Sequence, residues 1–356
     1  MKKRALFGFL AFLLVSCISL GTASATTAVV PNSLTTIEGD GANAFPFSIS
    51  LRNPPVPSMR YQQVFQSSEF STFGGPILIT QIAFRPDVVF GGAFSTTLSS
   101  IRIDLSTTTA APDALSSKFA KNVGKDDKTV YDGPLPLSSA FTGPVGGPMN
   151  FDILINLTTP FFYDPATGNL LLDVRNFGGG TTTFFDIQST SGDSTSRVFS
   201  SVSGRVDDPS GNLDSTGLVT QFTSSPFTVL SCVGFENTTN NGSGNVRNIK
   251  VLQLEADLVN SDGNIIIGTD IASPPVLHVV MVNAGGSTAT DVTDIALSAG
   301  KRTAGNQFVF TSNGTWQFNL MTKNYTTPGT YTVSILTGNI FEYVINPTCT
   351  ATFVIE

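Results

Sequence analysis

The chain has 356 residues and a formal net charge of −7, and 40% of its residues are hydrophobic while only 13% are charged. That hydrophobic share excludes a disordered chain, and the acidic balance argues against nucleic acid as a partner, because binding to phosphates requires a basic patch. Ser, Thr, Asn and Gly supply most of the polarity, which is typical of extracytoplasmic β proteins.

The first 25 residues have the pattern of a secretory signal peptide. Lys2-Lys3-Arg4 precedes an apolar run, residues 5–15, that is too short to span a bilayer, and Ala23-Ser24-Ala25 is a small-x-small cleavage site. Cleavage removes three of the 19 basic residues and none of the 26 acidic ones, which leaves a net charge of −10. We therefore expect a secreted or cell-surface, extracytoplasmic protein with no transmembrane segment after removal of the signal.

The signal region also contains a possible lipid anchor. Leu14-Val15-Ser16-Cys17 resembles a bacterial lipobox, in which Cys17 would become a lipidated first residue. Ile18, directly after the cysteine, and the well-formed Ala-Ser-Ala site favour the alternative, in which Cys17 is discarded with the signal. A lipid anchor is expected only if Cys17 is a lipobox cysteine.

Residues 26–42 are rich in Thr, Gly and Asn and are expected to form a flexible lead-in. Residues 43–223 then alternate apolar and polar side chains in nine or ten short segments, which is the period of half-buried strands. The clearest segments are 45–51, 77–84, 101–105, 151–157 and 170–174. One short helix is expected between Asp113, as N-cap, and Gly124. The pattern predicts a jelly-roll-like β-sandwich.

Residues 223–226, Thr-Ser-Ser-Pro, form a small polar stretch in which we expect a domain boundary. Residues 227–356 contain seven to eight strand patterns, and the last fifty residues repeat them most clearly. Trp316 alternates with polar neighbours beside Phe318 and Leu320, and is expected in the core. The pattern predicts an immunoglobulin-like β-sandwich, so the expected fold class is all-β, with two successive sandwiches.

Two cysteines remain after removal of the signal. Cys232 lies at the start of the second sandwich and Cys349 just before its last strand. First and last strands are often neighbours in a sandwich, so we expect a disulfide, which is common outside the cytoplasm. The alternatives are two buried free thiols or a metal pair, and the single His in the chain makes a zinc site the weaker of these.

Four segments, found in the order residues 59–64, 82–86, 119–122 and 163–176, include Met-Arg-Tyr-Gln-Gln-Val, Ile-Ala-Phe-Arg-Pro and Leu-Leu-Leu-Asp-Val-Arg-Asn. This set resembles the N-terminal module of secreted bacterial proteins that often carry a C-terminal PEP-type sorting signal, and it covers about half the chain. The resemblance implies secretion. The usual sorting tail is absent here, so exosortase-type anchoring is not expected.

In the second sandwich, an Asp-Gly-Asn turn at residues 262–264, Thr330-Tyr331 and the late Cys349 are similar to features of bacterial Ig-like modules named for a Pro-x-Lys-Phe (PxKF) motif. At residues 248–251 only Lys250 of that motif stands. Neither resemblance implies an activity or a set of catalytic residues.

Catalytic chemistry has little support in the sequence. The single His278 shares a strand face with Val280 and Val282, which indicates a packed strand residue more than a general base. Asp residues are plentiful, but no motif singles out the carboxylate pair that a glycosidase needs. We therefore do not expect an enzyme.

Acidic loops offer possible calcium ligands, since calcium takes several oxygen ligands from one short turn. Four loops have this composition, and they lie at residues 126–132, 164–169, 207–214 and 262–270. None has EF-hand spacing, and Asp and Asn are also ordinary turn residues. The preferred set is Asp207, Asp208, Asn212 and Asp214, and no other cofactor is expected.

Sugar binding usually uses exposed Trp or Tyr, and the chain has one Trp, six Tyr and 28 Phe. A lectin face is expected, if anywhere, around Tyr61 or Tyr163. The expected function is that of a non-catalytic secreted or cell-surface protein, which acts in adhesion, matrix or envelope association and binds a surface polysaccharide or an envelope protein. The alternatives are a calcium-assisted carbohydrate-binding protein and an unrecognised hydrolase.

Overall fold

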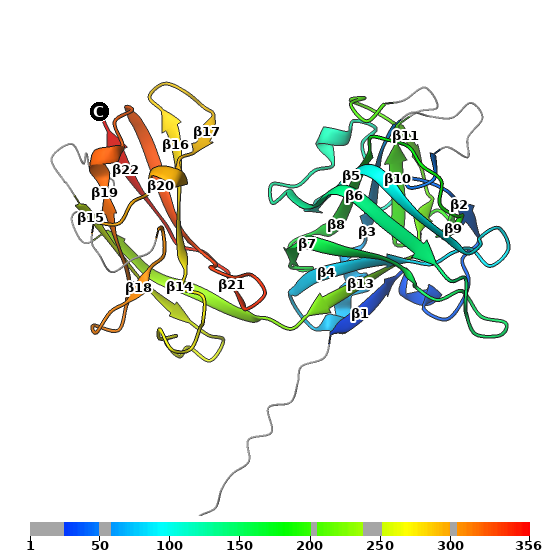
Figure 1. Cartoon of the computed structure of the whole chain (residues 1–356), viewed down its shortest axis with the longest axis horizontal. Helices are drawn as coiled ribbons and strands as arrows, with labels where there is room; N and C mark the ends of the chain where they lie inside the picture. Colours follow the sequence, from blue (N-terminus) through cyan, green and yellow to red (C-terminus); the bar gives the residue numbers. More distant parts are fainter. Residues whose placement is uncertain (1–24, 50–57, 201–204, 238–250, 300–304) are drawn as a thin grey trace, which may run out of the picture.

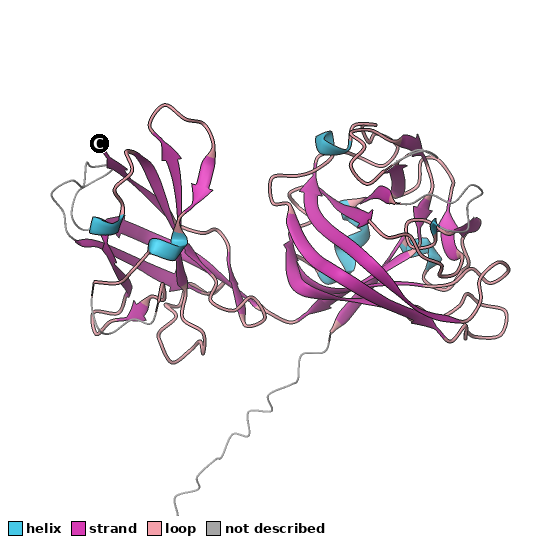
Figure 2. Ribbon diagram, turned by 45° about the horizontal axis from the view of Figure 1, so that its top comes forward, coloured by secondary structure: helices cyan, strands magenta, loops and turns pink. Residues whose placement is uncertain are grey.

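The computed structural model describes residues 25–49, 58–200, 205–237, 251–299 and 305–356. Nearly all regular structure in these ranges is β-strand, and the helical segments in them are short 3-10 turns (Figures 1 and 2). The prediction of an all-β, sandwich-type chain is confirmed. None of the helical segments in the described ranges has the length and hydropathy of a membrane-spanning helix.

The first part of the chain forms two large sheets and one small sheet. The four-stranded sheet has the order β1 (Thr26–Val30), β13 (Thr220–Ser225), β4 (Ile77–Phe84), β7 (Ile153–Tyr163). The six-stranded sheet has the order β11 (Asn212–Asp214), β10 (Thr195–Phe199), β3 (Met59–Phe65), β8 (Asn169–Asn176), β5 (Phe94–Thr108), β6 (Lys128–Ser139). The small sheet has the order β12 (Gly217–Leu218), β9 (Phe185–Gln188), β2 (Gly41–Asn43). One apolar cluster joins side chains of the two large sheets, so this part is a β-sandwich.

The second part of the chain has its own pair of sheets. The five-stranded sheet has the order β18 (Val309–Phe310), β19 (Trp316–Met321), β15 (Val251–Val259), β14 (Thr228–Asn237), β21 (Tyr343–Ile345). The four-stranded sheet has the order β17 (Ala289–Asp291), β16 (Val276–Asn283), β20 (Gly329–Leu336), β22 (Thr350–Ile355). A second apolar cluster fills the space between them. Figure 1 shows the two sandwiches joined by the short segment between β13 and β14.

The alternation of side chains explains why the strands form where they do. In β15, Leu252, Leu254, Ala256 and Leu258 are buried, while the residues between them are partly exposed. This is the predicted pattern, and it places one face of each strand in a core and the other toward water. Trp316 is 2% exposed in the second core, and its indole Nε1 donates to the carbonyl oxygen of Ile266 at 2.9 Å. The prediction of a core tryptophan is confirmed.

The helix expected between Asp113 and Gly124 is absent from that segment. Only Phe119–Lys121 forms a 3-10 turn, and Asp113 has a φ of 58°, which a helix does not allow. Leu115 and Phe119 are buried against the outer face of the six-stranded sheet. The two side chains therefore anchor a loop to the sheet and are not one face of a helix. Tertiary contacts here override the local helical pattern.

Two further expectations fail near the N-terminus. Thr26–Val30, which was expected within a flexible lead-in, is an edge strand that pairs with β13 from Thr26 opposite Ser224 onward. The β-branched residues of this segment suit a strand. Residues 45–47 form a turn instead of a strand, although Phe47 and Ile49 are buried. Most of the degraded Pro-x-Lys-Phe motif at 248–251 lies outside the described residues.

Candidate functional site

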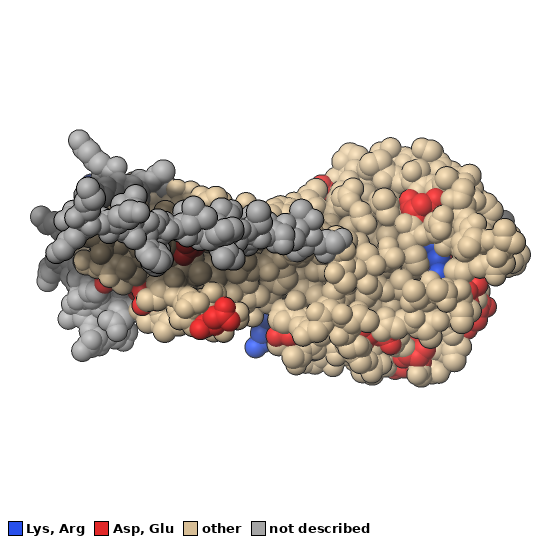
Figure 3. All heavy atoms as spheres, turned by 90° about the horizontal axis from the view of Figure 1, so that it is seen from below, with Lys and Arg blue, Asp and Glu red and all other residues tan. Residues whose placement is uncertain are grey.

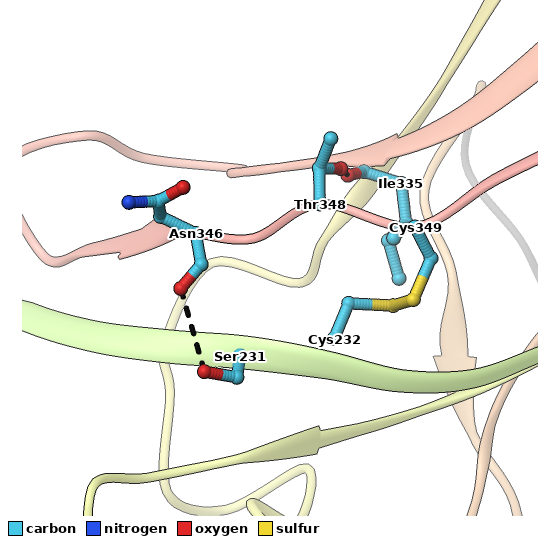
Figure 4. The surroundings of a disulfide bond; sticks show 6 residues. All are labelled: Ser231, Cys232, Ile335, Asn346, Thr348 and Cys349. Carbon is cyan, nitrogen blue, oxygen red and sulfur yellow. Dashed lines mark hydrogen bonds between the residues drawn. A yellow bond between two sulfur atoms is a disulfide. The ribbon is translucent and has the colours of Figure 1, made fainter. Parts of the chain in front are cut away.

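The predicted disulfide is present. Cys232 in β14 is bonded to Cys349, just before β22, with Cα atoms 5.5 Å apart (Figure 4). The bond therefore links the two sheets of the second sandwich. Next to it, the Ser231 hydroxyl donates to the Asn346 carbonyl oxygen at 3.4 Å, and the Thr348 hydroxyl donates to the Ile335 carbonyl oxygen.

The four preferred calcium ligands lie in one segment but have separate partners. Asp214 in β11 binds the Arg197 guanidinium with two bonds of 2.7 and 2.9 Å. Asp208 accepts a hydrogen bond from the Arg205 amide at 2.9 Å, and the exposed Asp207 carboxylate lies 3.8 Å from the Arg205 side chain. Asn212 is an exposed residue of β11. The calcium site at these residues stays a prediction.

The expected lectin face is wrong for both tyrosines. Tyr61 and Tyr163 are fully buried in the first core. Their hydroxyls donate to Gln63 Oε1 at 2.6 Å and to the Gly168 carbonyl oxygen at 2.8 Å. Burial raises the pKa of both phenols. Neither ring can stack on a sugar at the surface.

His278 lies on the outward face of β16 with Val280 and Val282, whereas Leu277 and its alternate neighbours face the core. Its Nε2 is 3.3 Å from Asp291 Oδ2. Ser334 is directly opposite His278 across the strand pair. Within the described residues no hydrogen bond joins this serine to the imidazole, so the geometry of an activated nucleophile is not formed there.

The first sandwich also has an exposed apolar turn. The turn after β4 contains three consecutive exposed apolar residues, Val88, Val89 and Phe90, which are 40%, 74% and 66% exposed. We call these three residues the apolar tip. Ile37, 61% exposed, belongs to a segment that bonds the base of this turn. Exposed apolar clusters of this kind are typical of interaction sites.

The backbone of the apolar tip is held by two carboxylates, the buried Asp87 and the partly exposed Glu38. Asp87 Oδ1 accepts hydrogen bonds from the amides of Val89 and Phe90, at 2.9 and 2.5 Å. Glu38 Oε1 accepts one from the Val88 amide at 2.9 Å, and the Asp87 carbonyl oxygen accepts one from the Gly91 amide at 2.9 Å. A Cβ at Gly91 would lie only 2.3 Å from that carbonyl oxygen, so the turn needs a glycine there.

Beneath the tip lies a group of three carboxylates, Glu38, Asp87 and Asp186, whose oxygens are within 4.8 Å of one another. It is the one such metal-sized group of His, Cys, Asp and Glu found in the described part of the chain, and it contains none of the predicted calcium ligands. We call it the acid cluster. Asp186 is fully buried and Asp87 is 4% exposed.

Arg85 neutralises part of the acid cluster. Its Nη2 is 2.6 Å from Asp186 Oδ2 and also donates to the Ile37 carbonyl oxygen at 2.7 Å. Burial nevertheless raises the pKa of Asp186 to about 6, and burial also raises the pKa of Glu38, whose Oε2 is buried without a hydrogen-bond partner. One cation among three carboxylates therefore leaves a site that takes up protons in mildly acidic solution.

A depression of about 390 Å³ adjoins Arg85. Its walls come from the Thr35-Thr36 segment, the loop 144–151 and Gln221. The Arg85 guanidinium lies 4.9 Å from the centre of the Phe151 ring, and Val145 at the tip of the loop is fully exposed. Arg85 thus lines the depression and also pairs with Asp186 of the acid cluster beneath the apolar tip, and we call this end of the first sandwich the loop end.

The outer face of the six-stranded sheet carries a second polar arrangement. Arg60, Arg175 and Arg102 are directly opposite one another on β3, β8 and β5, and we call them the arginine row. In the next row, the nearly buried Asp173 binds Arg60 with two hydrogen bonds, and Asp104 binds Arg102 and Arg175. The side chain of Arg102 is 40% exposed, and its terminal nitrogens have no hydrogen-bond partner among the described residues.

Comparison with known proteins adds no family to this description. No protein-family profile matches the sequence, and no curated protein matches it at a significant level. The function must therefore be argued from the geometry of the chain itself.

The sequence reasoning missed both the apolar tip and the acid cluster. The tip did have a signal, because an apolar triplet between Pro86 and Gly91-Gly92 is too short for a strand and is bounded by turn residues on both sides. The acid cluster had none, since its members come from segments about 50 and 100 residues apart.

Proposed function

We propose that the protein is a non-catalytic, extracytoplasmic binding protein that associates with a cell envelope or matrix through the loop end of its first sandwich. The observation that carries the proposal is the apolar tip. Three adjacent apolar side chains project from a turn whose backbone is fixed by the carboxylates of Asp87 and Glu38. A rigid apolar projection lowers the entropy lost on binding, which is a property of binding surfaces.

Other features support the same location and class. A disulfide in the second sandwich suits an oxidising compartment, in agreement with the signal-peptide pattern. We also propose that the two sandwiches are the modules that the sequence resembles, namely the module of PEP-sorting-signal proteins and the Ig-like PxKF module. Figure 3 shows acidic side chains scattered over one face with few basic ones, which favours partners other than anionic polymers.

Binding of the purified mature chain, from Thr26 onward, to isolated bacterial cell envelopes tests the proposal. The variant Val89→Ser/Phe90→Ser removes the two most exposed side chains of the tip. We expect it to bind at least tenfold more weakly, because a few buried apolar anchors carry most of the free energy of an interface. The matched control is Ile265→Ser/Phe341→Ser, which replaces apolar residues that are 50% and 58% exposed in the second sandwich.

A second candidate function, carbohydrate binding, is favoured by the arginine row. Alternating guanidinium and carboxylate groups on a sheet face offer donors and acceptors to the hydroxyls of a sugar, and Arg102 has unused donors. A glycan array with the mature chain, run with calcium and with chelator, tests it. Binding that Arg102→Ala abolishes would support this function, and binding that chelator abolishes would support the predicted calcium site. The absence of any bound glycan would contradict it.

A further inference from the structure

We infer that the partner of the apolar tip is a lipid surface, and that Val88, Val89 and Phe90 enter the interface of a zwitterionic bilayer. The inference rests on the proposed function and names the class of partner. It follows from three observations. The backbone amides of the turn are already hydrogen-bonded within the protein, few charged side chains lie near the turn, and the protein as a whole is acidic.

The backbone donors of the tip are all used inside the protein. The amides of Val88, Val89, Phe90 and Gly91 donate to Glu38 or Asp87. A backbone amide that enters hydrocarbon without a partner costs several kcal/mol, so satisfied donors favour entry of the turn into the interface of a bilayer, where water can still reach its carbonyl oxygens. A turn that stays in water has no such requirement, because water would satisfy its amides.

The same property argues against a protein partner. Protein interfaces contain about one hydrogen bond per 100–200 Å². The tip has no amide left to contribute, and its side chains are purely apolar. A partner that offers no hydrogen bonds, such as the acyl region of a bilayer, matches this surface better.

Side chains near the tip fit insertion as well. No Asp, Glu, Lys or Arg occurs between Asp87 and Arg102 in the sequence. The charged groups at the base of the turn are Glu38, Asp87, Asp186 and Arg85, of which the last three are at most 4% exposed. Of the charged groups at the base of the turn, only the partly exposed Glu38 would therefore approach an apolar layer with the tip.

The charge of the whole protein selects the kind of lipid. The chain carries 26 acidic and 19 basic residues, so an anionic membrane would repel it. A zwitterionic surface exerts no such repulsion. With only three apolar residues to insert, the binding is expected to be weak and reversible.

The test is flotation of the mature chain with phosphatidylcholine vesicles, and with vesicles that contain one third phosphatidylglycerol. We expect binding to phosphatidylcholine, weaker binding to the anionic vesicles at low salt, at least a tenfold loss for Val89→Ser/Phe90→Ser, and no loss for Ile265→Ser/Phe341→Ser. Equal binding of the tip variant and the wild type would overturn the inference.

A spectroscopic measurement locates the tip directly. The chain has one Trp, and Trp316 is buried in the second sandwich, so Phe90→Trp adds one reporter at the tip. We expect its emission to shift to the blue with phosphatidylcholine vesicles and to be quenched by brominated acyl chains, while the wild-type emission stays constant. An unshifted, unquenched emission would contradict insertion.

The proposed envelope binding and the proposed lipid partner can be refuted separately. If the wild type binds envelopes through the tip but does not bind phosphatidylcholine vesicles, the proposed function stands and the lipid partner is wrong. If it binds neither, both are wrong.

Discussion

Asp186 makes the stability of the first sandwich depend on pH in a direction that is unusual for a carboxylate with a cationic partner. Its pKa rises from 3.8 to about 6, because burial outweighs the attraction of Arg85. Each pKa unit corresponds to about 1.4 kcal/mol, so folding favours the neutral form by about 3 kcal/mol. Between pH 3.8 and about pH 6 the folded state binds more protons at Asp186 than the unfolded state does. The contribution of Asp186 to the free energy of unfolding therefore falls as the pH rises.

The variant Asp186→Asn isolates this contribution. Its amide cannot titrate, so the difference between Asn and a neutral Asp adds only a pH-independent amount to the free energy of unfolding. From pH 4 to pH 7 we expect the wild type to lose about 2.4 kcal/mol of stability relative to the variant, because the unfolded-state carboxyl is already partly ionised at pH 4. Glu38, whose pKa burial also raises, is present in both proteins.

Hydrogen exchange of the amides in β4 and β9 measures this effect locally, since the only Trp lies in the other sandwich. Unfolding free energies from these amides, taken at pH 4, 5, 6 and 7 with correction for the intrinsic exchange rate, give the two profiles. Parallel profiles would show that Asp186 has no raised pKa in the folded protein, and a difference of opposite sign would show that Arg85 outweighs burial.

Three further predictions concern separate parts of the chain. The double variant Cys232→Ala/Cys349→Ala removes a bond that closes a loop of 117 residues, and we expect a loss of up to about 5 kcal/mol in the second sandwich, seen as an earlier denaturant transition of Trp316 fluorescence. Gly91→Ala places a Cβ against the Asp87 carbonyl oxygen and is expected to weaken envelope binding while the overall melting temperature falls by only a few degrees. Asp173→Ala leaves Arg60 without the partner of its two hydrogen bonds, and we expect hydrogen exchange to show β3 and β8 destabilised by about 3 kcal/mol. Asp207→Ala, at an exposed position, is the control and is expected to change the stability of these strands by less than about 0.5 kcal/mol.

The fold class could be predicted because it depends on a local pattern. Alternation of apolar and polar residues, as at Leu252 to Leu258, is set by the strand itself and needs no knowledge of its partners. The core position of Trp316 and the pairing of Cys232 with Cys349 followed from the same alternation and from the common closeness of first and last strands.

The acid cluster could not be predicted because its members meet only in the folded chain. Arg85 and Asp186 are 101 residues apart, and no local signal in either segment indicates their ion pair. A lectin face, if there were one, was expected around Tyr61 or Tyr163, but the Tyr61 hydroxyl donates to Gln63 inside the core, which allows the ring to be buried. The helix expected from Asp113 fails for the same reason, since Leu115 and Phe119 are buried by a neighbouring sheet.

The central claim is that the apolar tip is the binding surface of the protein. The most direct test is the binding isotherm of the mature chain on isolated bacterial envelopes, compared for the wild type, Val89→Ser/Phe90→Ser and the control Ile265→Ser/Phe341→Ser. The account predicts saturable binding that falls at least tenfold for the tip variant alone. Binding of the same strength for all three proteins would contradict it.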